Sequence, residues 1–167
     1  MVSNPLWGVQ PVEVYAAATS VRAGESLSFH VSVADPAPPA AVHLAVYRCD
    51  QFDYGPENPF GRVAGEIYQG DYRGMLSPRD AEAAAYLADL DAASYPVGTD
   101  ASQSGCGWPS ATVWEVPDDV TAGVHIAVAT YRGDRAYALF VVRPSRPGVA
   151  TSILCQLACT THQAYNP

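Results

Sequence analysis

Charged residues are scarce in this chain, at 16% of 167 residues, and the positive ones are the scarcer sign. Nine Lys plus Arg stand against 17 Asp plus Glu, which gives a net charge of −8. Binding to nucleic acid or to anionic lipid needs a basic patch on the surface. We therefore expect no nucleic-acid partner and no attraction to membranes.

Long hydrophobic runs and targeting signals are also lacking. No stretch approaches the ~20 apolar residues that a membrane-spanning helix requires. The N-terminus, Met1–Trp7, has neither a charged region nor an apolar core of the kind found in signal peptides. The sequence as written predicts a soluble, cytoplasmic protein.

Several catalytic motifs are absent as well. The sequence contains no G-x-S-x-G, no phosphate-binding Gly-rich loop and no H-E-x-x-H. Its acidic residues are scattered, so no glycosidase pair can be proposed, and its histidines are not at metal-ligand spacing.

Cysteine is limited to four residues. On one strand, Cys155 and Cys159 would lie about 13 Å apart, too far for a disulfide, which favours small buried thiols. Cys49 and Cys106 flank a long insertion and could meet at its neck. A cytoplasmic setting would keep them reduced, and a disulfide bond between them is the alternative.

The residues that are present favour a β-rich domain. Apolar content is 49%, and a chain of this length can form one domain of about 130 to 150 residues plus a remnant. Short segments alternate apolar and polar residues, over 26–33, 42–47, 112–116, 124–128 and 136–143. Turns separate them, including Ala23–Glu25 and a hairpin turn at Arg132–Arg135. This pattern predicts an immunoglobulin-like β-sandwich over residues 1–143.

An insertion over 49–107 interrupts the strands. Ser77 and Asp80 form a capping box around Pro78, which predicts the start of a helix. Ala83, Tyr86, Leu87 and Leu90 would form its apolar stripe, and Pro96 and Gly98 would follow its end. We expect this helix to pack on the sandwich.

One outward face of the sandwich is predicted to be a docking surface. If Val124, Ile126 and Val128 face the core, the opposite side of two strands carries small, aromatic and histidine residues: His43, Ala45, Tyr47, His125, Ala127, Ala129 and Tyr131. Such a face, almost free of charge, suits contact with the insertion or a further domain. The two histidines favour a structural role over a metal pair.

The C-terminal part predicts the beginning of a second domain. Residues 144–148 form a Pro/Gly linker, and the apolar run Ile153–Cys159 follows it. A run of this kind is typical of a strand buried on both faces, as in parallel α/β sheets. Residues 149–167 are therefore expected to be the first strand of a truncated α/β domain. Such folds place their chemistry just past the strand ends, here at Thr161–Asn166.

Five segments in matching order resemble the C-terminal region of the N,N-dimethylformamidase large (beta) subunit. They are T-S-V-x-x-G-E-x-L-x-F-H-V-S over 19–32, Tyr47-Arg48, Val116-Pro117 with Gly123-Val124, Phe140–Arg143 and Thr161–Asn166. The resemblance covers roughly residues 12–48 and 108–167. The 49–107 insertion replaces the Gly/Trp/Tyr-rich stretch that is usual after Tyr-Arg.

The resemblance implies an amide hydrolase in which a sandwich precedes a glutamine-amidotransferase-like α/β domain. The characterised enzyme cleaves dimethylformamide with mononuclear iron held by two tyrosines and a glutamate. The motif tyrosine of that pattern corresponds to Tyr165, which is the one iron-ligand position carried over. His162 and Asn166 would support the metal or orient substrate. A packing role for Tyr165 and a simple turn at Asn166-Pro167 are the alternatives.

A single ligand does not hold a catalytic metal, so the resemblance implies that these 167 residues are inactive alone and carry no iron. The missing α/β domain or other subunits would be the partners of the sandwich. A competing hypothesis is a stand-alone module that binds carbohydrate or protein through aromatic residues of the insertion: Phe52, Tyr54, Phe60, Tyr68 and Tyr72. A third is a purely structural assembly domain. The C-terminal run favours the first hypothesis, because a finished binding module has no need of it.

Overall fold

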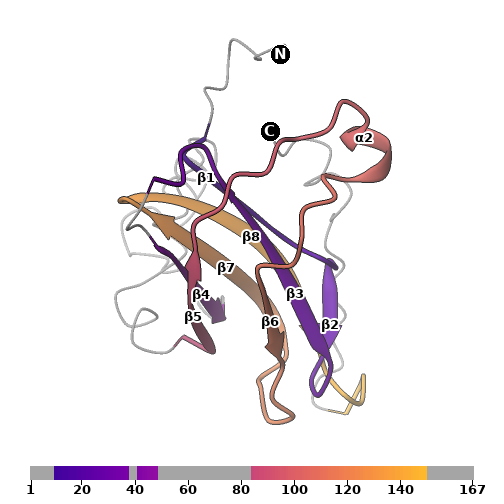
Figure 1. Cartoon of the computed structure of the whole chain (residues 1–167). Coiled ribbons are helices and arrows are strands. Elements are labelled where there is room, and N and C mark those ends of the chain that lie inside the picture. Colours follow the sequence, from indigo (N-terminus) through magenta and orange to yellow (C-terminus); the bar gives the residue numbers. More distant parts are fainter. Residues whose placement is uncertain (1–9, 38–40, 49–83, 150–167) are drawn as a thin grey trace, which may run out of the picture.

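The computed structural model describes residues 10–37, 41–48 and 84–149 of the chain. These ranges are mainly β-structure, arranged as two curled sheets (Figure 1). The smaller sheet has the order β1 (Val12–Ala16), β3 (Ser26–Val33), β6 (Thr112–Glu115). The larger has the order β2 (Ser20–Arg22), β8 (Asp134–Arg143), β7 (Gly123–Tyr131), β4 (Ala41–Arg48), β5 (Tyr86–Asp91).

Strand pairing is antiparallel except between β2 and β8, which run parallel. The chain crosses from the small sheet to the large one directly after β1, so β1 and β2 belong to different sheets. One helical turn, α2 (Ala101–Ser104), lies in the connection between β5 and β6. Within the described ranges, no helix has the length and apolar character needed to cross a bilayer.

The two sheets share one core, which the alternation in the sequence predicts for β3 and β4. Every second residue of these strands is buried in it: Leu27, Phe29, Val31, Val33, Val42, Leu44 and Val46. Aromatic rings join the sheets, because Phe140 of β8 meets Phe29 and Trp114 edge-on, with ring centroids 5.7 and 6.0 Å apart. Such edge contacts add to the free energy of burial.

Two turns expected from the sequence are confirmed. The turn between β2 and β3 closes with the Glu25 N–H donating to the Arg22 carbonyl at 3.1 Å, and Gly24 takes a φ of 83°. The β7–β8 hairpin turns at Arg132 and Gly133, with φ values of 51° and 93°. Two consecutive positive φ values are those of a type I′ turn, whose twist matches the flanking strands.

The helix predicted over Tyr86 and Leu90 is wrong. These residues belong to β5, which pairs with β4 along the register Val42–Leu90 to Val46–Tyr86. A spacing of four residues fits one face of a helix and also one face of a strand, so Tyr86 and Leu90 do not distinguish the two structures. Leu87 distinguishes them, because it is 59% exposed on the opposite side of the strand. The earlier part of the predicted helix, including Ser77, lies outside the described residues.

The predicted orientation of β7 is also wrong. Ala127, Ala129 and Tyr131 face the core, while Ile126 and Val128 lie on the other side of the sheet. Both faces of β7 are buried, so apolar alternation could not show which one meets the small sheet.

The predicted docking surface therefore combined residues of two faces. His125 is buried between the rings of Trp114 and Phe140, whereas His43 is exposed and pairs with Asp89 at 2.9 Å. The two histidines lie on opposite sides of the large sheet and form no metal pair, as the structural interpretation expects.

Candidate functional site

The site residues predicted from the sequence, His162, Tyr165 and Asn166, lie outside the described residues, and so do the aromatic residues proposed for the insertion. Within the described ranges, titratable and aromatic side chains gather on the outer side of the small sheet. We call this group the Tyr15 cluster; it consists of Glu13, Tyr15, His30, Cys106 and Trp108.

Strands β1 and β3 place three members of the Tyr15 cluster. Val12 and Val14 face the core, so Glu13 and Tyr15 between and after them face outward. Tyr15 lies opposite His30 in the register, and their rings stack with centroids 4.4 Å apart at an angle of 9°. The Trp108 ring lies 5.4 Å from that of Tyr15 and is only 6% exposed.

The segment between β5 and β6 is bound along β3 and brings in the other two members. Ser32 Oγ accepts a hydrogen bond from the Tyr95 N–H at 2.9 Å and donates one to the Tyr95 carbonyl at 3.1 Å. The Trp108 indole N–H donates to the Pro96 carbonyl at 3.2 Å, which fixes the loop that carries Cys106. The cluster thus depends on contacts between residues that are far apart in sequence, such as Tyr15 and Trp108.

His30 has a defined tautomer when neutral. Its Nδ1 lies 2.8 Å from the Trp108 carbonyl and 3.1 Å from the Pro109 carbonyl. Carbonyl oxygens only accept, so Nδ1 carries the hydrogen and donates it. The lone pair of the neutral ring is then on Nε2, which is the atom able to take up a proton.

Burial changes the acidity of three side chains in the cluster. It raises the pKa of the Glu13 carboxyl group. It also raises the pKa of the Cys106 thiol, and the nearby Glu13 carboxylate adds to that rise. The pKa of Tyr15 is raised mainly by burial, partly offset by a hydrogen bond with the Trp108 backbone.

These shifts limit the chemistry that the Tyr15 cluster can perform. The thiolate is the reactive form of cysteine, so a raised pKa makes Cys106 a poor nucleophile. Cys106 is a free thiol, and Cys49, with which the sequence analysis considered a disulfide, lies outside the described residues. What remains is a carboxyl group and an imidazole beside stacked rings, a set suited to hydrogen bonding and packing rather than covalent catalysis.

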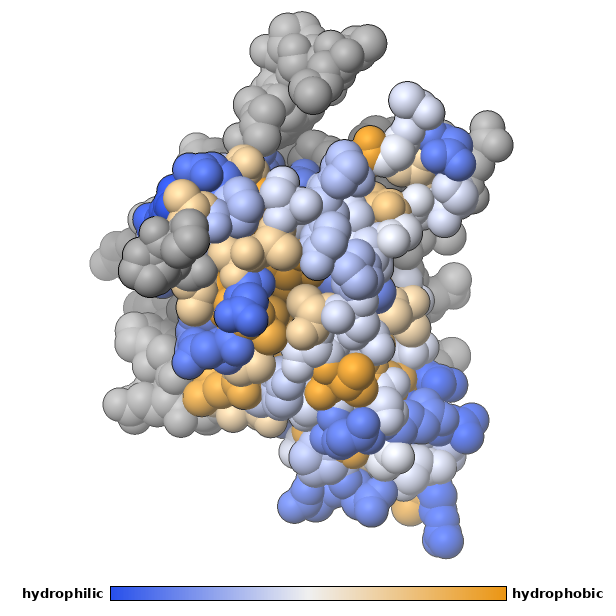
Figure 2. Space-filling model, in the orientation of Figure 1, coloured by the Kyte–Doolittle hydropathy of each residue, from blue (hydrophilic) through white to orange (hydrophobic). Residues whose placement is uncertain are grey.

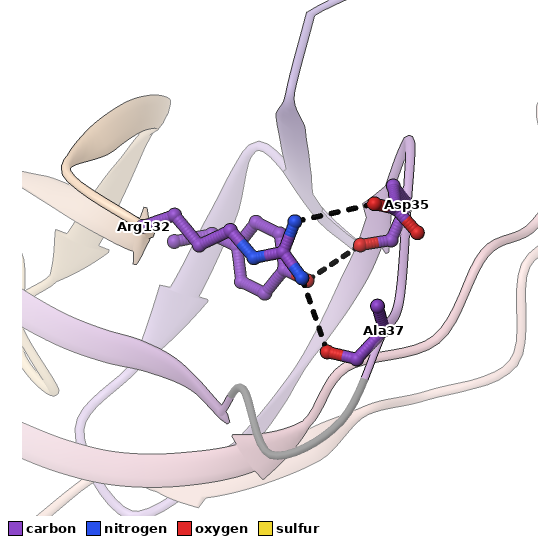
Figure 3. A network of polar contacts seen from close by, with 4 residues as sticks. Asp35, Ala37 and Arg132 are labelled. Atoms are coloured by element: carbon purple, nitrogen blue, oxygen red, sulfur yellow. Dashed lines mark hydrogen bonds and ion pairs between the residues drawn. The ribbon is translucent and has the colours of Figure 1, made fainter.

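A second polar group lies at the β7–β8 hairpin (Figure 3). The Arg132 guanidinium donates to the Asp35 carboxylate at 3.2 Å and to the Ala37 carbonyl at 3.1 Å. The Tyr131 hydroxyl donates to the Asp35 carbonyl at 2.6 Å. A cavity of about 260 Å³ lies here, lined by Pro11, Ala34, Asp35, Tyr131, Arg132 and Asp134. Its arginine is already engaged, so the network ties the hairpin to the segment after β3.

Neither group offers a metal site. Among the described residues, no three or more His, Cys, Asp or Glu side chains come together in a way that could hold an ion.

The outward position of three members of the Tyr15 cluster follows from the sequence pattern. Val12-Glu13-Val14-Tyr15 alternates apolar and outward residues, and His30 follows the same rule in β3. The contributions of Cys106 and Trp108 had no comparable signal, because they come from a loop that only the fold brings to this sheet.

A comparison with known protein families identifies the family of this chain. The family model described as N,N-dimethylformamidase beta subunit-like, C-terminal, matches residues 64–167, more than half of the chain. The chain belongs to this family. The match includes residues 64–107, which the motifs had left out, and ends with the segment that contains Tyr165.

Similarity of the dimethylformamidase-like chain to solved structures is weak. The Pseudomonas fluorescens alkylpurine DNA glycosylase AlkC, bound to DNA with an abasic site analog, is 16% identical at a TM-score of 0.36. That match covers 80% of this chain but only 31% of the glycosylase chain. The soluble domain of PmoD from Methylocystis sp. ATCC 49242 (Rockwell) is 12% identical at a TM-score of 0.38, covering 83% of this chain and 94% of that one. Scores this low do not establish a shared fold. None of the curated proteins matches the sequence.

Proposed function

We propose that this chain is the support part of an amide hydrolase similar to N,N-dimethylformamidase, with Thr161–Asn166 as the first turn of the active site. Membership of the family carries the proposal, because the matched region runs from residue 64 through that turn. Two sheets with one shared core agree with a supporting role. We further propose that they form an immunoglobulin-like sandwich that an α/β domain or other subunits dock against.

In this proposal Tyr165 supplies one iron ligand, and His162 and Asn166 orient the metal site or the substrate. Phenolate oxygen suits ferric iron, a hard cation. Bound iron would polarise the amide carbonyl and lower the pKa of a water molecule. One ligand does not hold a catalytic metal, so the 167 residues alone are proposed to be inactive.

The competing binding-module hypothesis gains no support from the aromatic side chains of the Tyr15 cluster. Tyr15 stacks on His30, and Trp108 is almost fully buried. A sugar ring needs an open aromatic face to stack on, and these faces are already covered.

The test compares amide hydrolysis by the 167-residue chain with that of a protein in which an α/β domain of this family continues it. We expect no release of formate from dimethylformamide by the chain alone and measurable release by the longer protein. Tyr165→Phe in the longer protein should lower the rate at least about 100-fold, because removing a ligand costs more than removing its outer partners. It should also weaken the visible absorption of iron-bound phenolate, because one of the two tyrosine ligands is lost.

Tyr95→Phe is the matched control, since only the backbone of Tyr95 makes the hydrogen bonds to Ser32. It should leave rate and absorption unchanged. Full activity of the Tyr165→Phe variant would refute the role of Tyr165, and hydrolysis by the chain alone would refute the support role.

A further inference from the structure

The outer side of the large sheet is apolar, although the small sheet packs on its other side. We call it the back face; its residues come from the three inner strands β4, β7 and β8: Ala45, Val124, Ile126, Val128, Leu139 and Val141. The register makes them neighbours, with Ala45 beside Val128 and Ile126 beside Leu139. The charged residues of this face, Asp89, Asp91, Arg135 and Arg143, lie at its margins, on the edge strand β5 and at the two ends of β8. The patch is therefore continuous and uncharged.

The centre of the back face is buried. Ile126 is 0% exposed, Ala45 2% and Val128 4%, yet none of them belongs to the core between the sheets. A side chain that stands on an open sheet face keeps water above it, so burial this complete requires a covering layer.

The described segments do not form that layer. The small sheet lies on the opposite side, where its Phe29 and Trp114 meet Phe140. The segment between β5 and β6 is bound to the outer side of β3 instead. Residues 144–149, which follow β8, are exposed. The side of the molecule seen in Figure 2 differs from the back face, because hydrophilic residues gather at its lower end and its apolar residues form separate patches.

We propose that residues 150–167 of this chain cover the back face, through the apolar run Ile153–Cys159. This segment contains no Asp, Glu, Lys or Arg, which matches an uncharged surface. Residues 49–83, by contrast, carry charged side chains throughout, from Asp50 to Glu82. Burying unpaired charges against such a face would be costly.

The connection allows this packing. Strand β8 ends at Arg143, two residues after Val141 of the back face. The six residues 144–149 can span at most about 20 Å. Three adjacent strands are about 10 Å wide, so the apolar run can reach the whole back face. The turn Thr161–Asn166 would then be anchored to the large sheet. The inference does not depend on the proposed hydrolysis or on iron.

The native thiols of Cys155 and Cys159 test the proposal in the intact chain. Their alkylation by iodoacetamide is followed by mass spectrometry, with Cys106 on the small sheet as an internal reference. In the wild type we expect both to react at least about tenfold more slowly than in the urea-unfolded chain, since local opening limits access.

Val128→Asp places a charge in the back face and should bring both thiols close to the unfolded rate, with Cys106 unchanged. Val113→Asp is the control, because Val113 is 44% exposed on the small sheet. It should leave Cys155 and Cys159 protected. If Val128→Asp does not fold, Val141→Asp at the less buried margin gives the same test.

Three outcomes would overturn the proposal. Unprotected thiols in the wild type would show that residues 150–167 are elsewhere. Protection that survives a folded Val128→Asp or Val141→Asp variant would mean that the segment is buried against another surface. Unprotected thiols together with a dimer that Val128→Asp dissociates, by size-exclusion chromatography, would assign the back face to a second copy of the chain.

Discussion

Glu13 lies half-buried on the outer side of β1, near the thiol of Cys106. Burial raises the pKa of its carboxyl group because the charged form loses hydration. Strand alternation predicts its outward position, but not its burial, which depends on the loop that carries Trp108.

We expect Glu13→Gln to change the dependence of stability on pH. A carboxyl group whose pKa is raised on folding favours the folded state below its unfolded pKa of about 4.5, and this contribution is lost as the pH rises through the folded value. The glutamine side chain does not titrate, so the variant lacks this pH-dependent contribution. Its free energy of unfolding relative to wild type should therefore increase as the pH rises from below 4.5 towards neutrality, as measured by urea unfolding. Parallel curves would contradict this.

At the scale of elements, β5 shows why a short apolar pattern can mislead. Tyr86 and Leu90 pack against the core and Leu87 points away from it. A helix would put Leu87 and Leu90, three residues apart, on the same side. The six-residue ladder with β4, and the Tyr86 hydroxyl bonded to Thr112 at 2.6 Å, hold this segment as a strand at the sheet edge.

Two alanine substitutions distinguish the strand from the helix. Leu90→Ala should lower the free energy of unfolding by about 1–2 kcal/mol, less than for a fully buried leucine because Leu90 is only partly buried. Leu87→Ala should change it by less than about 0.5 kcal/mol, since that side chain is exposed. Equal losses in urea unfolding would favour one apolar helical face.

At the scale of the molecule, the aromatic contacts of Phe140 connect the two sheets. The ring lies between Phe29 and Trp114 of the small sheet and also stacks on His125 of the large one, 5.7 Å away. Phe140 is 1% exposed, so its removal would leave a cavity that the surrounding strands cannot easily fill.

Phe140→Ala should therefore lower the free energy of unfolding by about 3–5 kcal/mol. Tryptophan fluorescence and far-ultraviolet circular dichroism should report the same shifted midpoint, because both sheets depend on this ring. Val97→Ala, at a position 55% exposed, is the control and should leave the midpoint unchanged. Separate transitions for the two signals would show that the sheets unfold independently.

The sequence by itself determined the strands whose two faces differ, the tight turns and the family. In β3 and β4 the buried residues alternate with polar or small ones, so local pattern and burial agree. Gly24 and Gly133 marked turns because positive φ favours glycine. The ordered motifs up to Tyr165 indicated the dimethylformamidase family, which the family model confirms.

Only the tertiary structure decided the orientation of β7, the strand at Tyr86–Asp91 and the assembly of the Tyr15 cluster. When a strand is apolar on both faces, its residue pattern does not indicate which face packs against the other sheet. A six-residue segment with two apolar side chains four apart fits both periods until a partner strand binds it. The cluster joins Tyr15 and His30 to Trp108. These residues are far apart in sequence, so they are buried together only once the sheets have formed.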